Sequence, residues 1–101
     1  MPALQIAVPR EILADLCRRW SIQRLSFFGS VLRNDFTPDS DIDVLVEFMP
    51  GEEPGLIAFS ALQSELEDLF GGRSVDLVTP GFLHNAFRER IRRDAVVQYA
   101  A

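Results

Sequence analysis

Apolar residues recur at intervals of three and four in three stretches of the chain, which places them along one face of an α-helix. Pro9 opens the first stretch, at a position where helices tolerate proline, and Gly71 is expected to end the second. The three predicted helices cover residues 9–20, with Leu13, Leu16, Cys17 and Trp20 on one face, 56–70, with Phe59, Leu62, Leu66 and Leu69, and 82–95, with Leu83, Phe87 and Ile91.

Shorter segments alternate between apolar and polar positions, or form brief apolar runs, as strands do. Residues 24–28, 41–48 and 74–79 are therefore predicted as strands. Residues 96–100 either extend the helix before them or turn back as an edge strand, and we favour the edge strand. Residues 30–35 are expected to form one or two helical turns between the first two strands.

The order of these elements indicates the fold class. Three core strands need cover, and the amphipathic helices can supply it by burying their apolar faces against a sheet. The link between the first two strands is too short for an ordinary parallel crossover, so the sheet should be mixed. We therefore predict a single domain over residues 1–101, of the α+β class, with a small mixed sheet of three to four strands covered by about four helices.

The composition is that of an ordinary globular protein, with 48% hydrophobic and 25% charged residues among 101. No segment has the roughly 20 apolar residues of a membrane span, and no signal-peptide pattern opens the sequence. Cys17 is the only cysteine, so no internal disulfide can form. A cytoplasmic location is expected, with Cys17 as a buried hydrophobic residue rather than a nucleophile.

The charge of the chain argues against several classes of function. The net charge is −5 and the sequence pI is about 4.7, which disfavours strong nucleic-acid binding through the overall field. All ten basic residues are arginine. Without lysine, neither Schiff-base chemistry nor a Walker-type phosphate loop is available.

Two carboxylates interrupt the start of the strand predicted at 41–48. Asp41 and Asp43 point to one side of that strand, about 6–7 Å apart, while Ile42 and Val44 point to the other. Like charges held this close are unfavourable unless a cation lies between them. Because the available ligands are oxygens only, the expected cation is Mg²⁺.

A third carboxylate interrupts the strand predicted at 74–79, where Asp76 stands between two apolar residues. If this strand lies beside the one at 41–48, Asp41, Asp43 and Asp76 converge. Three carboxylates suit two metal ions and an in-line displacement at phosphorus. All three are therefore candidate catalytic residues and metal ligands.

Gly29 and Ser30 follow the first predicted strand and fit a phosphate-binding role. Glycine lets a ligand approach the backbone closely, and the short helix that follows would offer free N–H groups. The Ser30 hydroxyl adds a donor, and Arg33, one turn further on, could hold phosphate oxygens. Gly29, Ser30 and Arg33 are therefore candidate nucleotide-binding residues.

Each of these residues also has a purely structural interpretation. The Gly-Ser pair could form an ordinary turn, and the Asp-x-Asp pattern could cap one. Asp76 could occupy an edge or form a salt bridge, and Arg33 could pair with Asp35 or Asp39. Taken together these interpretations are weaker, because they leave three carboxylates in apolar stretches to coincidence.

These residues also carry a resemblance to a known family. Gly29-Ser30, ten residues, and then Asp41-Ile42-Asp43 match the GSx10DxD signature of the DNA polymerase β-like nucleotidyltransferase superfamily. The segment FGSxxRxDxxxxSDIDVLVEF, with VDLVTP after it, resembles the minimal nucleotidyltransferases. These are small proteins that often act as the antitoxin of a HEPN-domain toxin, and the resemblance extends from about Leu16 to Tyr99.

The resemblance implies a nucleotidyltransferase fold and a role for each matching residue. Asp41 and Asp43 would bind two Mg²⁺ ions, Asp76 would complete the metal site, and Gly29-Ser30 would hold the triphosphate of ATP. The chain departs from the common family pattern at Val31, where a basic residue is usual, and at Asn34, where glycine is usual.

Two hypotheses on function follow. In the first, the chain transfers a nucleoside monophosphate, AMP from ATP, to a hydroxyl of the partner toxin, expected to be a tyrosine, within a type VII-like toxin–antitoxin pair. In the alternative, a non-catalytic module neutralises its partner by binding alone. A metal-dependent phosphohydrolase is a third reading, but it does not explain Gly29-Ser30.

The remaining chain suggests surfaces rather than chemistry. Arg88, Arg90, Arg92 and Arg93 make the last predicted helix basic, either as a solvated face or as a contact to a partner or RNA. A chain of this size has no room to wall its own substrate, so the walls would come from a HEPN-domain partner or from a homo-oligomer. Acidic residues around the loop 49–55 favour a protein or small-molecule acceptor over nucleic acid.

Overall fold

A four-stranded sheet organises the chain in the computed structural model, which describes residues 6–32, 37, 39–82 and 85–101. The predicted order of elements is confirmed, and the predicted short helix is a 3-10 segment. The elements are α1 (Arg10–Arg19), β1 (Ile22–Phe28), the 3-10 segment η1 (Gly29–Leu32), β2 (Ile42–Phe48), α2 (Leu56–Leu69), β3 (Val75–Val78), the 3-10 segment η2 (Pro80–Phe82), α3 (Asn85–Asp94) and β4 (Val96–Ala100).

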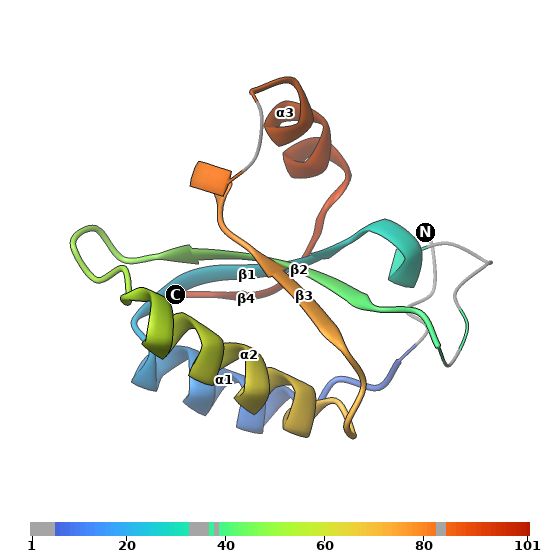
Figure 1. Ribbon diagram of the computed structural model, residues 1–101, viewed down its shortest axis with the longest axis horizontal. Coiled ribbons are helices and arrows are strands. Elements are labelled where there is room, and N and C mark those ends of the chain that lie inside the picture. The colour runs from blue at the N-terminus through green and yellow to red at the C-terminus, as the bar shows by residue number, and fades with distance from the viewer. Residues whose placement is uncertain (1–5, 33–36, 38, 83–84) are drawn as a thin grey trace.

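The sheet is mixed, as the short link between the first two strands predicted. Its strand order is β3-β2-β1-β4 (Figure 1). The strand β1 is antiparallel to both β2 and β4, whereas β2 and β3 are parallel. Residues 96–100 therefore form the edge strand that the sequence favoured over a longer helix. The α+β class with a four-stranded sheet is confirmed.

The helices divide between the two faces of the sheet. Helices α1 and α2 lie together under one face, and α3 stands on the other side (Figure 1). The core fills the space between the sheet and the α1–α2 layer, where the alternate residues of β2 are fully buried. The ring of Phe27 meets that of Phe70 edge-on, with centroids 5.5 Å apart. The face toward α3 carries the half-buried Asp43 and Glu47 of β2 together with the buried Leu45.

Cys17 lies in this core and is completely buried. Burial raises the pKa of its thiol from 9.0 to about 12, an effect that the nearby Arg18 only partly offsets. The thiol therefore stays protonated at neutral pH, as its predicted role of a buried hydrophobic residue requires.

Two element boundaries can be traced to specific contacts, one between strands and one within the end of a helix. The strand β1 begins at Ile22, two residues before the prediction, because Ile22 pairs with Phe48 across an irregularity in the register. Helix α2 ends as predicted: Gly71 has a φ of +76° and the amide of Gly72 donates to the carbonyl of Glu67. Within the residues described, no helix is long and apolar enough to span a bilayer.

Candidate active site

The strand β2 presents its carboxylates on the face opposite the α1–α2 layer. Ile42 and Val44 are fully buried in the core, while Asp43 between them is half-buried on the other side. Asp41 directly precedes the strand and is exposed. The alternation predicted along β2 is confirmed for Asp43, which lies near the beginning of the strand on the side where α3 stands, and Asp41 lies directly before the strand.

Asp76 is the direct neighbour of Asp43 in the sheet. The parallel register of β2 and β3 pairs Asp43 with Asp76, and paired residues of neighbouring strands point to the same face. The starts of the two strands are aligned by a 2.9 Å hydrogen bond from the amide of Ile42 to the carbonyl of Ser74. The fold thus brings together two carboxylates that are 33 residues apart in the sequence. β3 is an edge strand, and Asp76 is exposed on it.

The turn before β2 is held by its own hydroxyl and by an arginine. The amide of Thr37 donates to the Ser40 Oγ at 3.0 Å, and the amide of Ser40 donates back to the Thr37 carbonyl. The Arg73 guanidinium, just before β3, donates to that same carbonyl at 2.7 Å. The structural interpretation of the Asp-x-Asp pattern was that it caps this turn, but here Ser40 makes a capping contact. Asp41 lies where the turn meets the strand.

Gly29 lies against the Asp43 carboxylate. Phe28 pairs with Asp43 across β1 and β2, so the chain leaves β1 directly beside that side chain. A Cβ at position 29 would come within 2.1 Å of the Asp43 Oδ2, far inside van der Waals contact. The backbone also has a φ of +74° there, which side chains other than glycine rarely adopt. Only glycine fits between the end of β1 and this carboxylate.

The donor set suits Mg²⁺, but the described chain does not preassemble a cage for it. Asp41, Asp43 and Asp76 supply hard oxygen ligands on one face. Among the residues that the structure describes, no group of three or more histidine, cysteine or acidic side chains is close enough to hold a metal ion. Mg²⁺ is commonly bound by one or two carboxylates together with substrate phosphates. The residues therefore fit a metal that arrives with its nucleotide.

The phosphate-binding half of the predicted site is only partly described. Gly29 and the backbone of Ser30 open η1, next to Asp43. The side chain of Ser30 and the whole of Arg33 lie outside the described residues. Their expected contacts to phosphate remain predictions.

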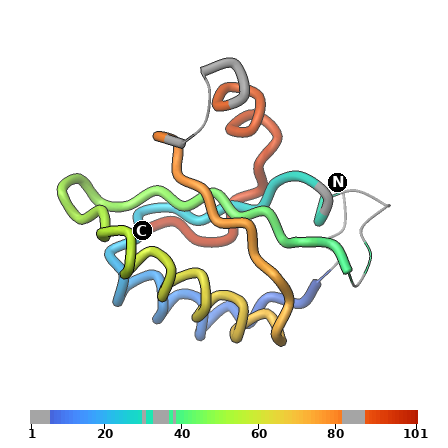
Figure 2. Tube along the Cα trace, in the orientation of Figure 1, coloured from blue at the N-terminus to red at the C-terminus, as the bar shows by residue number. Residues whose placement is uncertain are grey.

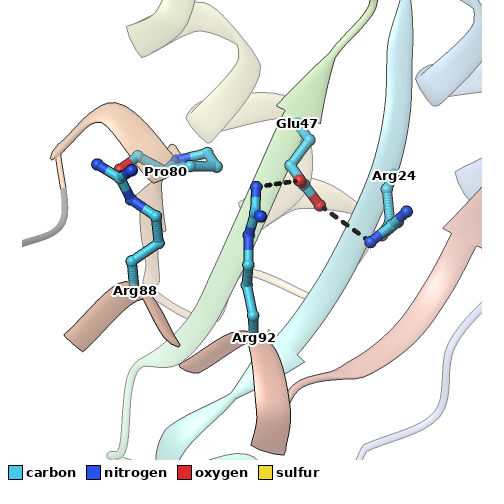
Figure 3. A network of polar contacts seen from close by, with 5 residues as sticks. All are labelled: Arg24, Glu47, Pro80, Arg88 and Arg92. Atoms are coloured by element: carbon cyan, nitrogen blue, oxygen red, sulfur yellow. Dashed lines mark hydrogen bonds and ion pairs between the residues drawn. The ribbon is translucent and has the colours of Figure 1, made fainter. Parts of the chain in front are cut away.

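A polar network that the sequence did not predict lies further along β2. Glu47 is on the same face of the strand as Asp43 and lies between two arginines (Figure 3). Arg92 of α3 donates to its Oε1 at 3.0 Å, and Arg24 of β1 lies 3.7 Å from its Oε2. Arg88, one turn before Arg92, donates through Nε to the carbonyl of Pro80 at 3.1 Å.

This network changes the interpretation of the basic helix. Arg88 and Arg92 share a face, as their spacing predicts, but that face contacts η2 and the sheet of the same chain rather than only solvent. The pairing could have been suspected from the acidic residue four positions after Asp43 and the two arginines four apart. Nothing in the sequence aligns these two segments, since 45 residues separate Glu47 from Arg92.

Residues 9–98 match the family model of the nucleotidyltransferase domain. The chain belongs to the nucleotidyltransferase family. The match includes every predicted site residue, from Gly29 to Asp76. The predicted class of activity, that of a nucleotidyltransferase enzyme, is confirmed.

Curated relatives of this nucleotidyltransferase are found among archaea. It is 38% identical over 89 residues to a Methanocaldococcus jannaschii protein provisionally named a protein adenylyltransferase, covering 88% of this chain and 91% of the relative. It is 37% identical over 82 residues to the protein adenylyltransferase MntA of Thermococcus cleftensis, covering 81% of this chain and 80% of the relative. These relatives have nearly the same length as the nucleotidyltransferase itself.

Solved structures share its fold. One described as a provisional minimal nucleotidyltransferase superposes with a TM-score of 0.72 at 38% identity, covering 86% of both chains. A toxin–antitoxin structure with AMP-PNP gives a TM-score of 0.72 at 20% identity, covering 93% of this chain and 75% of the other. An MntA–HepT toxin–antitoxin structure gives 0.63 at 19% identity, covering 91% and 70%. The resemblance to the minimal nucleotidyltransferases is confirmed.

Proposed function

We propose that this nucleotidyltransferase transfers AMP from ATP to a hydroxyl of a partner toxin, expected to be a tyrosine of a HEPN-domain protein, in a Mg²⁺-dependent reaction. The observation that carries the proposal is the Asp43 carboxylate, which lies against Gly29 and is paired in register with Asp76. Nucleotide transfer needs such an arrangement, in which backbone that can bind phosphate and acidic side chains lie at the same end of neighbouring strands. The protein adenylyltransferase relatives support AMP as the transferred group.

Each residue has a distinct role in the proposed reaction. Asp41 and Asp43 would hold the metal ions, and Gly29, Ser30 and Arg33 would bind the β- and γ-phosphates. Bound Mg²⁺ would neutralise the triphosphate and polarise the α-phosphate toward attack. These positions orient the nucleotide so that its α-phosphorus faces the acceptor.

The bond changes follow from this orientation. The acceptor oxygen forms a bond to the α-phosphorus while the bond from that phosphorus to the bridging oxygen breaks. Pyrophosphate leaves with the electron pair of the broken bond, on the side of Gly29-Ser30. Asp76, paired in register with Asp43, is exposed and can orient the attacking hydroxyl and accept its proton.

Two observations support a protein as the proposed acceptor: the net charge of the chain and the toxin–antitoxin structures that share its fold. A net charge of −5 disfavours a nucleic-acid acceptor. Two of the structures that share the fold are toxin–antitoxin structures, one with AMP-PNP and another of MntA with HepT. In this proposal the chain is the antitoxin, acts in the cytoplasm where ATP is available, and uses its partner to complete the walls of the site.

Intact-mass spectrometry tests the proposal. The partner toxin, expected to be a HEPN-domain protein, is incubated with ATP, Mg²⁺ and the nucleotidyltransferase. We expect the partner to gain one or more AMP units with the wild type and none with the Asp41→Asn, Asp43→Asn double variant. The same two forms are then compared for rescue of growth in cells that express the partner at native levels. An unmodified partner together with rescue by the double variant would instead establish the non-catalytic binding module.

A further inference from the structure

Two large aliphatic side chains are exposed at the start of α2. Leu56 is 80% exposed and Ile57 is 89% exposed, although α2 buries Leu62 and Leu66 completely on its core face. The other exposed large hydrophobic residues of the described chain, Ile12 and Val97, lie on separate elements. Adjacent aliphatic side chains left in water are a common mark of an interaction surface.

Leu56 also borders a pocket. A cavity of about 510 Å³ lies where the end of β2, the loop 49–55, the start of α2 and η2 meet. Its apolar lining comes from six residues, namely Val46, Phe48, Pro54, Leu56, Phe59 and Pro80. The loop extends beyond the end of the sheet (Figure 2), and its Glu53 and Pro54 line the pocket. The volume lies in the range of ligand-binding pockets and has room for an apolar side chain of a partner.

The rim of this pocket is acidic. Glu53 lines it, and the exposed Glu52 stands next to Glu53 in the same loop. Glu47 also reaches the pocket, but its charge is already shared by Arg24 and Arg92. Within the part of the chain that the structure describes, neither Glu52 nor Glu53 forms a salt bridge. Their charges are therefore available to a cationic partner and repel phosphate.

We propose that this surface, formed by Leu56, Ile57, Glu52, Glu53 and the pocket beside them, docks a protein segment that inserts an apolar side chain flanked by lysine or arginine. The inference rests on the proposed function, since the segment would belong to the toxin that receives AMP. A second copy of this chain is a poorer match. Two of the four arginines of α3, its most basic segment, already contact their own chain, Arg88 at Pro80 and Arg92 at Glu47.

The docking surface and the carboxylates lie at opposite ends of β2. Asp43 is near the start of the strand and Phe48, which lines the pocket, ends it. Five residues of strand separate them, about 16 Å. A partner held at the pocket would thus leave the nucleotide at Asp43 uncovered. The surface would supply affinity for the partner, and the carboxylates would supply chemistry.

Matched substitutions test this surface. Ile57→Glu adds a charge to the first turn of α2, and Ile12→Glu makes the same change in the first turn of α1, where Ile12 is 62% exposed. Glutamate is favourable at both helix starts, so neither variant should impair folding. Binding of the HEPN-domain protein is measured by calorimetry. We expect Ile57→Glu to raise the dissociation constant about tenfold or more. Ile12→Glu should leave the dissociation constant within about twofold of the wild-type value.

Charge reversal at the rim provides a second arm. Glu53→Arg should also weaken binding about tenfold, and it should reduce the salt dependence of the association rate. Equal affinities for wild type, Ile57→Glu and Glu53→Arg would overturn the proposal. So would light scattering that shows a wild-type dimer converted to a monomer by Ile57→Glu, with toxin binding unchanged, because the surface would then join two copies of this chain.

The docking surface and the transfer reaction can fail separately. If Ile57→Glu weakens binding but the wild type adds no AMP, the surface stands and the proposed function falls. If AMP is added at equal rates by wild type and Ile57→Glu at low toxin concentration, the function stands and the surface falls. If both hold, transfer by Ile57→Glu is slow at low toxin concentration and recovers as the toxin concentration is raised.

Discussion

The sequence predicts only part of the role of Gly29. A glycine after a strand predicts close approach of a ligand, and the structure adds a nearer reason: the Asp43 carboxylate already occupies the space of a side chain at position 29. The sequence could not show this, because the contact depends on the antiparallel register that pairs Phe28 with Asp43. Gly29 is therefore required to position a carboxylate before any nucleotide binds.

Gly29→Ala should destabilise the chain and displace Asp43. The left-handed backbone alone costs an alanine about 1–2 kcal/mol, and the collision with Oδ2 adds to that. Gly51→Ala is the matched control, since its φ is +78° but no atom lies within 4 Å of the added Cβ. We expect urea unfolding to give a larger loss of free energy of unfolding for Gly29→Ala than for Gly51→Ala. Equal losses would show that the Asp43 contact has no consequence.

Helix α3 is the element whose placement the sequence did not reveal. Its spacing of arginines indicated a basic face, and the alternation along β2 put Glu47 on the same side as Asp43, but no local signal joins the two. The contacts come from Arg92 to Glu47 and from Arg88 to the carbonyl of Pro80. They tie α3 to the strand that carries Asp43 and to Pro80 at the start of η2. The helix is thereby held over the face of the sheet that carries Glu47 (Figure 3).

Glu47→Gln should loosen α3 without unfolding the sheet. The pairs with Arg24 and Arg92 are partly exposed, with Glu47 18% and Arg92 49% exposed, so their loss should cost about 0.5–1 kcal/mol. Hydrogen exchange should become faster for the amides of α3 and stay unchanged in β1 and β2. The control is Glu89→Gln, an exposed change of the same kind on α3. The difference should shrink in 1 M salt, and identical exchange in both variants would refute the tether.

At the scale of the whole molecule, the pattern of apolar residues was sufficient to predict the layers. Alternation placed the apolar side of β2 against helices, and the short link between β1 and β2 predicted a mixed sheet. The prediction that the carboxylates converge depended on β3 lying beside β2. The sequence could not establish the parallel register that sets Asp43 beside Asp76, because sequence patterns do not choose between neighbouring registers. Cys17, predicted as a buried hydrophobic residue, lies in the core that these layers enclose.

Burial of Cys17 should make the stability of the whole molecule fall at alkaline pH. The folded pKa is raised to about 12 from 9.0, so the unfolded thiol loses its proton first as pH rises. The contribution of the buried thiol to the free energy of unfolding is fully present below pH 9 and is lost as pH rises toward 12. Between pH 8 and pH 10 the loss should be about 1 kcal/mol. Urea unfolding of Cys17→Ala over the same interval should show a drop smaller by that amount, and equal drops would contradict the assignment.

The central claim, that Asp41 and Asp43 hold metal together with a nucleotide whose α-phosphorus Asp76 faces, is tested most directly by crystallography with Mn²⁺ and a non-hydrolysable ATP analogue. Mn²⁺ replaces Mg²⁺ and is located by its anomalous scattering. The account predicts an anomalous peak about 2.1 Å from carboxylate oxygens of Asp41 and Asp43, with the triphosphate over Gly29 and Asp76 facing the α-phosphorus. A bound nucleotide with no metal at these carboxylates, or with metal held only elsewhere, would contradict it.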